Sequence, residues 1–158
     1  GWGGVVAPPA PGEIVELPAV KALVEAGIIV ITVGGGGIPV IRKDDGSLEG
    51  IAAVIDKDYA SEKLAEDIDA DGLVILTAVE KASINFGRAD QKDLDVLPVE
   101  QAKEYAHKGH FAPGSMLPKI NAATAFAASK KGRIAIISSL EKALDALEGR
   151  TGTLIIQK

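Results

Sequence analysis

Apolar and polar residues recur at helical spacing in five stretches of the chain. In "GEIVELPAVKALVEAG" the apolar side chains return every three or four residues, and Gly27 stands where a helix end is expected. The other four stretches are "DYASEKLAEDI", "DLDVLPVEQAKEYAHKG" from about Pro98 to Gly109, "SMLPKINAATAFAASKKG" from Ser115 to Gly132, and "SSLEKALDALEG". In the last stretch, Ser138 and Glu141 have the spacing of a capping box. We therefore predict five helices.

Strand patterns lie between these helices. The stretch "IIVITV" (28–33) is apolar on both faces, as parallel strands are, and predicts a buried strand. Further strands are predicted at "DGLVILT", "KASINF", "RIAIISS" and "GTLIIQK". Asp45-Gly46, at the centre of "RKDDGSLEG", is typical of a β-hairpin turn. Strands alternating with helices favour βαβ units, so the predicted fold class is α/β: three αβα layers with a mostly parallel sheet.

Composition and charge narrow the classes of function. The 158 residues are 47% hydrophobic and 25% charged, which fits one soluble domain or one lobe of a two-lobed protein. A net charge of −5 does not favour binding to the negatively charged backbone of a nucleic acid, so no nucleic-acid partner is expected. A local cluster of lysines around one small anion remains compatible with this charge.

The sequence leads to one expectation about the cellular location of the protein and one about the start of the chain. There is no cysteine, the apolar runs are too short to span a bilayer, and nothing resembles a signal peptide, so we expect a cytoplasmic protein without a membrane partner. The chain begins at Gly1 with a loop-like stretch in which Trp2 and Val5-Val6 resemble buried anchors. We interpret this start as a cut, a processed terminus or a second half.

Four consecutive glycines, Gly34, Gly35, Gly36 and Gly37, follow the predicted strand 28–33. Open α/β sheets bind ligands at the carboxyl ends of their strands, and glycine lets backbone N–H groups converge on an anion. A tight crossover turn would explain the run equally well. No Gly-Lys-Ser/Thr follows, so this is not a Walker A loop. Ile38-Pro39 stiffens the exit and argues against a flexible linker.

Two lysines stand at predicted helix starts. Lys57 lies between Asp56 and Asp58, and Lys119 falls in the first turn of the helix that we expect Ser115 to cap. A cation is unfavourable at a helix N-terminus unless an anion lies in front of it, so the two placements together indicate a shared polyanion such as nucleotide phosphates. Taken alone, Lys57 is better explained as a surface lysine beside Asp58 acting as the helix cap.

Other catalytic arrangements are weakly represented. His107 and His110 have no third ligand at metal spacing, so we interpret them as structural or surface residues and predict no protein metal site. No Ser–His–Asp triad or pair of carboxylates stands out. Phosphoryl transfer needs neither, because it depends largely on positioning and charge neutralisation. The residues therefore predict a lobe that binds nucleotide phosphates.

Five motifs together resemble carbamate kinase, in the amino-acid kinase superfamily. They are "VGGGGIPV", "AVIDKDYAS", "LVILTAVEKASINFG", "GHFAPGSMLPKINAA" and "SLEKALDALEGRTGT", in order over nearly all of the chain. The resemblance implies reversible phosphoryl transfer between ATP and carbamate, with ADP, carbamoyl phosphate and Mg²⁺ as the other reactants and cofactor. It also implies a role in arginine fermentation, where the reaction runs toward ATP, and assembly as a homodimer.

The resemblance also implies roles for individual residues. Lys57 and Lys119 would neutralise the nucleotide phosphates and the transferred group, while Asp58 would organise the lysines. The four glycines 34–37 would donate backbone N–H groups near the acceptor. Residues expected to line the adenine and ribose pocket are Thr77, Ala78, Val79, Phe86 and Met116. For Phe86, an ordinary core position is the alternative.

Family members are about twice as long as this chain, and the resemblance implies that the missing half comes first. It would carry a further catalytic lysine and most of the carbamate pocket. Residues 1–37 are then expected to be a remnant of the acceptor-binding lobe, and residues 38–158 the nucleotide-binding lobe. Two alternatives stay open: a truncated lobe that binds ATP or ADP without turnover, and another amino-acid kinase acting on acetylglutamate or uridylate.

Overall fold

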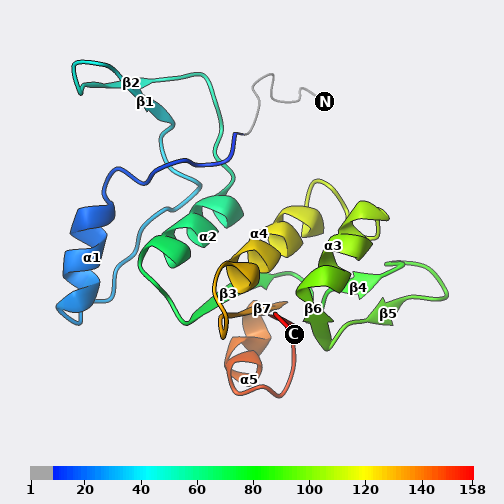
Figure 1. The fold of residues 1–158 in the computed structure, drawn as a ribbon. Helices are drawn as coiled ribbons and strands as arrows, with labels where there is room; N and C mark the ends of the chain where they lie inside the picture. The colour runs from blue at the N-terminus through cyan, green and yellow to red at the C-terminus, as the bar shows by residue number, and fades with distance from the viewer. Residues whose placement is uncertain (1–8) are drawn as a thin grey trace. The chain divides into compact units, whose positions relative to one another are not determined.

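The computed structural model describes residues 9–158 (Figure 1). The chain divides into two compact units, residues 1–64 and 65–158, and the boundary falls inside helix α2 (Lys57–Asp67). The predicted anchors Trp2 and Val5-Val6 lie outside the described residues. The predicted division after residue 37 concerns function, and it stays a prediction.

The first unit contains a helix and a hairpin that the sequence predicts. Helix α1 (Leu17–Glu25) ends in a Schellman motif, in which the N–H groups of Gly27 and Ile28 donate to the carbonyls of Val24 and Leu23 at 2.9 and 3.0 Å. Strands β1 (Val40–Arg42) and β2 (Leu48–Gly50) pair antiparallel around a turn with Gly46 at φ +83°. Both elements are stabilised by short-range hydrogen bonds, which explains why local sequence predicts them.

The predicted buried strand over 28–33 does not form. These residues have no regular secondary structure, and the side chains of Ile29 and Ile31 are 93% and 98% exposed. A strand needs a neighbour to satisfy its N–H and C=O groups, and no described strand pairs with this segment. The prediction was wrong because apolar composition specifies what a strand would bury but supplies no partner.

The second unit is built on a four-stranded sheet. Its strands are β3 (Gly72–Thr77), β6 (Val96–Pro98), β7 (Ile134–Ser139) and β8 (Thr153–Ile156), in the order β3-β7-β8-β6. The pairs β3–β7 and β6–β8 are parallel, and β7–β8 is antiparallel. A small antiparallel pair, β4 (Ser83–Ile84) with β5 (Lys92–Asp93), lies in the connection between β3 and β6. The mostly parallel sheet is confirmed.

Helices cover both faces of this sheet (Figure 1). Helices α3 (Val99–His107) and α4 (Met116–Ser129) lie on one face, and α5 (Ala143–Leu147), which follows the short η1 (Leu140–Lys142), lies on the other. The largest fully buried apolar side chains come from the sheet and from α4, and they are Leu97, Ile120, Phe126, Ile137 and Ile155. The three-layer αβα arrangement is therefore confirmed.

Two predicted helix caps differ from the structure. Ser138 lies inside β7 and is fully buried, its Oγ has no hydrogen-bond partner in the structure, and the predicted capping box does not form. Ser115 directly precedes α4, as predicted, but its side chain makes no capping bond. In residues 9–158, no helix is both long enough and apolar enough to cross a membrane.

Candidate functional site

The glycine run is a loop with unusual backbone angles. Val33, Gly34, Gly36 and Gly37 all have positive φ values, of 54°, 37°, 123° and 98°. For Val33, a β-branched residue, this conformation is costly and persists only when its surroundings enforce it. The N–H groups of Gly34 and Gly36 donate within the loop, to the carbonyls of Thr32 and Val33. The run is thus a shaped turn rather than an extended linker.

Gly36 packs directly against the segment that precedes α2. A Cβ atom added to Gly36 would lie 1.9 Å from the Ile55 carbonyl oxygen, a distance that no side chain can occupy. At Gly34, Gly35 and Gly37 an added Cβ would meet nothing within 4 Å, and these three glycines are exposed. The structure therefore brings the glycine loop to the start of α2, with one glycine buried at the contact.

Lys57 is the first residue of α2, and the two aspartates on either side of it have different roles. The Asp56 carboxylate accepts the backbone N–H of Asp58 at 2.7 Å and so caps the helix. Asp58 is buried, with 7% of its surface exposed, and its carboxylate lies 3.9 Å from the Lys57 Nζ. The interpretation of Asp58 as the helix cap was therefore wrong, because Asp56 has that role. Asp58 is placed to hold the Lys57 ammonium.

In the second unit, one edge of the sheet gathers most of the predicted nucleotide residues. Thr77, at the carboxyl end of β3, pairs with Ser139, at the carboxyl end of β7. Since β8 runs the other way, its first residue, Thr153, pairs with Ile137 close to the same edge. Thr77 to Val79 therefore leave the sheet where an open α/β sheet places its ligands.

Helix α4 returns to this edge at its N-terminus. Ser129, its last residue, connects through 130–133 to Ile134 at the start of β7. With 14 residues at about 1.5 Å each, α4 is about 21 Å long, and β7, with six residues at about 3.3 Å, is about 20 Å long. The helix packs on β7 and β3, so Met116 and Lys119 begin it at the edge where Thr77 lies. Both side chains are partly buried.

Phe86 is not a core residue, because 67% of its surface is exposed. It lies in the excursion 78–95, which buried hydrogen bonds fasten to the sheet. The Thr153 hydroxyl accepts the Ala82 N–H at 2.9 Å and donates to the Leu94 carbonyl at 2.5 Å. The sequence analysis missed Thr153, since a threonine at the start of a strand carries no signal of such a role.

Further polar contacts shape this excursion. The Ser83 hydroxyl donates to the Asp93 carboxylate at 2.6 Å, and this bond, with a second from Gln91, lowers the pKa of Asp93. Lys81 donates to Asp95 at 2.6 Å, which raises the pKa of the lysine. These contacts were not predicted, and they keep Phe86 on a fixed hairpin.

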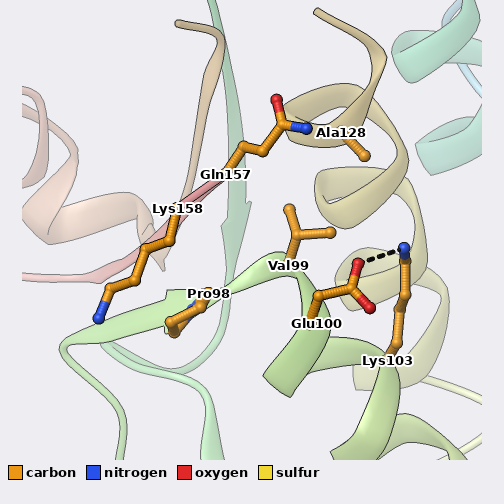
Figure 2. A pocket seen from close by; sticks show the side chains of 7 residues that line it. All are labelled: Pro98, Val99, Glu100, Lys103, Ala128, Gln157 and Lys158. Atoms are coloured by element: carbon orange, nitrogen blue, oxygen red, sulfur yellow. Dashed lines mark hydrogen bonds and ion pairs between the residues drawn. The ribbon is translucent and has the colours of Figure 1, made fainter. Parts of the chain in front are cut away.

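A cavity in this unit lies at the opposite edge of the sheet. It measures about 310 Å³ and is lined by Pro98, Val99, Glu100, Lys103, Ala128, Gln157 and Lys158 (Figure 2). None of these residues belongs to the predicted site. Glu100 and Lys103 form an ion pair with each other, at 2.7 Å. We therefore place the candidate site at the edge carrying Thr77 and Met116.

The two histidines and the two lysines complete the account of predicted residues. The His110 ring packs edge-on against Tyr105, and within residues 9–158 no group of three His, Asp or Glu side chains could hold a metal ion. Lys57 and Asp58 belong to the first unit, and Lys119 belongs to the second. The convergence of both lysines on one ligand remains a prediction.

Comparison with known proteins identifies relatives for nearly the whole chain. The model of the amino acid kinase family matches residues 9–138. The carbamate kinase-like protein YqeA of Escherichia coli is 57% identical over 99% of this chain, and a carbamate kinase of Clostridium perfringens is 52% identical over the same share. Each alignment covers 50% of the relative, so the chain spans about half the length of these proteins.

Solved structures show the same likeness. The structure of a carbamate kinase from Giardia lamblia bound to AMP-PNP superimposes with a TM-score of 0.91 at 42% identity. The match covers 96% of this chain and 47% of the Giardia chain. The fold described above is therefore shared with about half of that enzyme.

Proposed function

Because this chain belongs to the amino acid kinase family, we propose that it forms the nucleotide-binding part of a carbamate kinase-type phosphotransferase. The enzyme would transfer a phosphoryl group reversibly between ATP and carbamate. Identity near 50% to carbamate kinases over the whole chain favours carbamate over acetylglutamate or uridylate as the acceptor. The AMP-PNP bound to the Giardia relative supports ATP or ADP as the nucleotide.

The contact between Gly36 and Ile55 is the observation that carries the proposal. It brings exposed glycine backbone to the N-terminus of α2, where Lys57 stands beside the buried Asp58. Backbone N–H groups, a helix N-terminus and an ammonium group each favour an anion. A phosphoryl group in transfer is such an anion, and Asp58 would keep Lys57 directed at it.

In the proposed reaction, a carbamate oxygen forms a bond to the γ-phosphorus of ATP. The bond from that phosphorus to the β–γ bridging oxygen breaks, and its electron pair leaves with ADP. Lys57 and Lys119 would neutralise charge on the transferred group, which is the main protein contribution in phosphoryl transfer. In the opposite direction, carbamoyl phosphate and ADP give ATP, the direction proposed for arginine fermentation.

The second unit would hold the nucleoside. Thr77 to Val79, Phe86 and Met116 would line the adenine and ribose pocket, and the exposed Phe86 ring offers an apolar face to a base. Mg²⁺ would be carried mainly by ATP oxygens, as this ion usually is in kinases, and would neutralise phosphate charge when bound. A cytoplasmic homodimer belongs to the same proposal and is supported by the resemblance alone.

A second function is favoured by one specific observation. The chain spans about half the length of its relatives, so residues that complete the acceptor site of those proteins can lie outside it. The alternative is a lobe that binds ATP or ADP and transfers nothing. The two proposals share the nucleotide site and differ in turnover.

Calorimetry with ADP tests the shared nucleotide site. Lys57→Ala and Lys119→Ala should each weaken binding by about tenfold to 100-fold, because a charge-assisted hydrogen bond contributes about 1.5–3 kcal/mol. Lys103→Ala, whose lysine pairs with Glu100 at the opposite edge, is the matched control and should leave affinity unchanged. Unchanged affinity in both site variants would refute the two-lysine site.

A coupled assay of ATP formation from carbamoyl phosphate and ADP separates the two functions. Turnover by this chain alone supports the phosphotransferase and removes the alternative. Tight ADP binding without turnover supports the alternative for the isolated chain. Lys57→Ala should abolish any turnover that is seen, since it removes charge neutralisation at the transferred group.

A further inference from the structure

Helix α2 is followed by an aspartate at the position where α1 and α3 are followed by glycine. Asp69 has φ +55°, and its N–H donates to the Glu66 carbonyl at 3.0 Å, as in a Schellman ending. The equivalent residues after α1 and α3 are Gly27 and Gly109. An aspartate adopts this conformation less easily than a glycine does, so its presence here indicates a role for its carboxylate.

The Asp69 carboxylate is bound by a buried arginine. Arg133 is 8% exposed, and its guanidinium donates to Asp69 at 2.8 Å and to the Glu66 carbonyl at 3.3 Å. The same guanidinium donates to the Ser129 hydroxyl at 2.6 Å and lies 5.0 Å from the centre of the Phe126 ring. Glu66 belongs to the last turn of α2, and Ser129 is the last residue of α4. One side chain therefore joins the carboxyl ends of these two helices.

Stability alone does not explain a buried cation at this position. The cost of removing a charge from water offsets most of the attraction in a buried ion pair. In Arg133, moreover, the Nε atom is buried and has no hydrogen-bond partner among the described residues. An apolar side chain could fill the same space without leaving a donor unpaired. The guanidinium supplies what an apolar side chain cannot, a planar set of donors that fixes the geometry of several acceptors.

The other end of α2 carries the lysine of the candidate site. Lys57 is its first residue, and the helix continues without a break through 11 residues, a length of about 16 Å. A group that holds the last turn of this helix therefore also directs its first turn. Helix α4 depends less on Arg133, because its Ile120 and Phe126 are fully buried and the helix packs on β7.

We propose that Arg133 is a positioning residue for nucleotide binding. It holds the last turn of α2 at the end of α4 and thereby directs the Lys57 ammonium group toward the phosphates. The inference rests on the proposed function, in which Lys57 binds a phosphate group, and it adds a residue that acts on this site through α2.

A double-mutant cycle on ADP affinity, measured by calorimetry, tests this role. Arg133→Met should weaken ADP binding by about fivefold, both in the otherwise unchanged chain and in the Lys119→Ala variant. In the Lys57→Ala variant the same substitution should have an effect below about twofold, because no ammonium group is left to direct. A residue that only stabilises the fold would weaken binding by the same factor in both lysine variants.

Lys130→Met is the matched control. Lys130 also donates to Asp69, at 2.8 Å, but its side chain is 59% exposed. Exposed ion pairs contribute little, so ADP affinity should stay unchanged. If Arg133→Met does not fold, Arg133→Lys replaces it in the cycle. This variant keeps the charge but loses the planar set of donors, and the same pattern of losses is expected.

The outcomes separate this inference from the proposed function. Affinity that falls in Lys57→Ala but not in the Arg133 variant overturns the positioning role and leaves the phosphate site intact. Equal losses from the Arg133 substitution in the Lys57→Ala and Lys119→Ala variants also overturn it. Unchanged affinity in Lys57→Ala itself refutes the phosphate site at Lys57, and the positioning role with it.

Discussion

The two units of this chain bury their apolar residues to very different degrees. In the second unit, Leu97, Phe126 and Ile155 are fully enclosed between a sheet and its helices. In the first, Ile29, Ile31 and Ile38 are each more than four-fifths exposed. The difference teaches that β-branched residues form a core when the same chain supplies the neighbouring strands, as β3, β7, β8 and β6 do.

The largest expected effect comes from the core of the second unit. Phe126→Ala should lower the free energy of opening at β7 amides by about 3–5 kcal/mol, since it leaves a cavity and removes the ring 5.0 Å from the Arg133 guanidinium. Ile31→Ala in the first unit should change stability by less than about 0.5 kcal/mol. Native-state hydrogen exchange measures both. Equal losses would show that Ile31 is already packed in solution.

A smaller effect is expected where the first unit is tightly packed. Gly36→Ala places a side chain at φ +123° and against the Ile55 carbonyl, and the backbone strain alone costs about 1–3 kcal/mol. Thermal unfolding and ADP calorimetry should both report the loss. Gly35→Ala, with open space around the added Cβ, should behave as wild type. A neutral Gly36→Ala would mean that the loop does not rest on residue 55.

An intermediate to small effect is expected at Thr153, which is fully buried in the second unit. Thr153→Val keeps the side-chain shape but removes the acceptor of the Ala82 N–H, and an unsatisfied buried donor costs about 1–3 kcal/mol. Exchange at the Ala82 amide should accelerate accordingly. In the matched control, Thr151→Val, the lost partner is the exposed carboxylate of Glu80, and the change should be small. Equal acceleration in both variants would contradict an anchoring role for Thr153.

The smallest effect is a pH-dependent one at Asp69. Hydrogen bonds from Lys130 and then Arg133 lower the pKa of this carboxyl below its ordinary value of 3.8. Stability from a lowered carboxyl pKa is present above the unfolded value and is lost as pH falls through the folded one. Asp69→Asn should therefore destabilise the second unit slightly at pH 7, with no difference once the pH is well below 3.8. A difference that persists in acid would exclude this ion pair as its cause.

Local signals predicted the elements that depend on local bonds. The ends of α1 and α3 were expected at Gly27 and Gly109, and both glycines have the positive φ that a Schellman ending requires. The hairpin around Asp45-Gly46 follows from the same kind of short-range chemistry. The αβα layers could be predicted because periodicity alone distinguishes strands from helices in the second unit.

Non-local features escaped prediction. Within residues 9–158 no strand pairs with the segment 28–33, and no feature of the segment itself reveals this. At the start of α2, two neighbouring aspartates could each have capped the helix, and the backbone geometry that selects Asp56 is invisible in the sequence. Ser138 matched a capping box, yet β7 continues through it to pair with β3. In each case a distant segment or the local backbone angles decided the outcome.

The main-chain contact of Gly36 with Ile55 holds together the two ends of the segment 36–55. The largely exposed β1–β2 hairpin lies between these two residues. The base of the segment is the contact of the Gly36 backbone with the Ile55 carbonyl, in which no side chain takes part. Insertions, deletions or grafted sequences in 40–50 can therefore be absorbed without shifting the base. This makes the hairpin a natural attachment point for a reporter or an affinity tag.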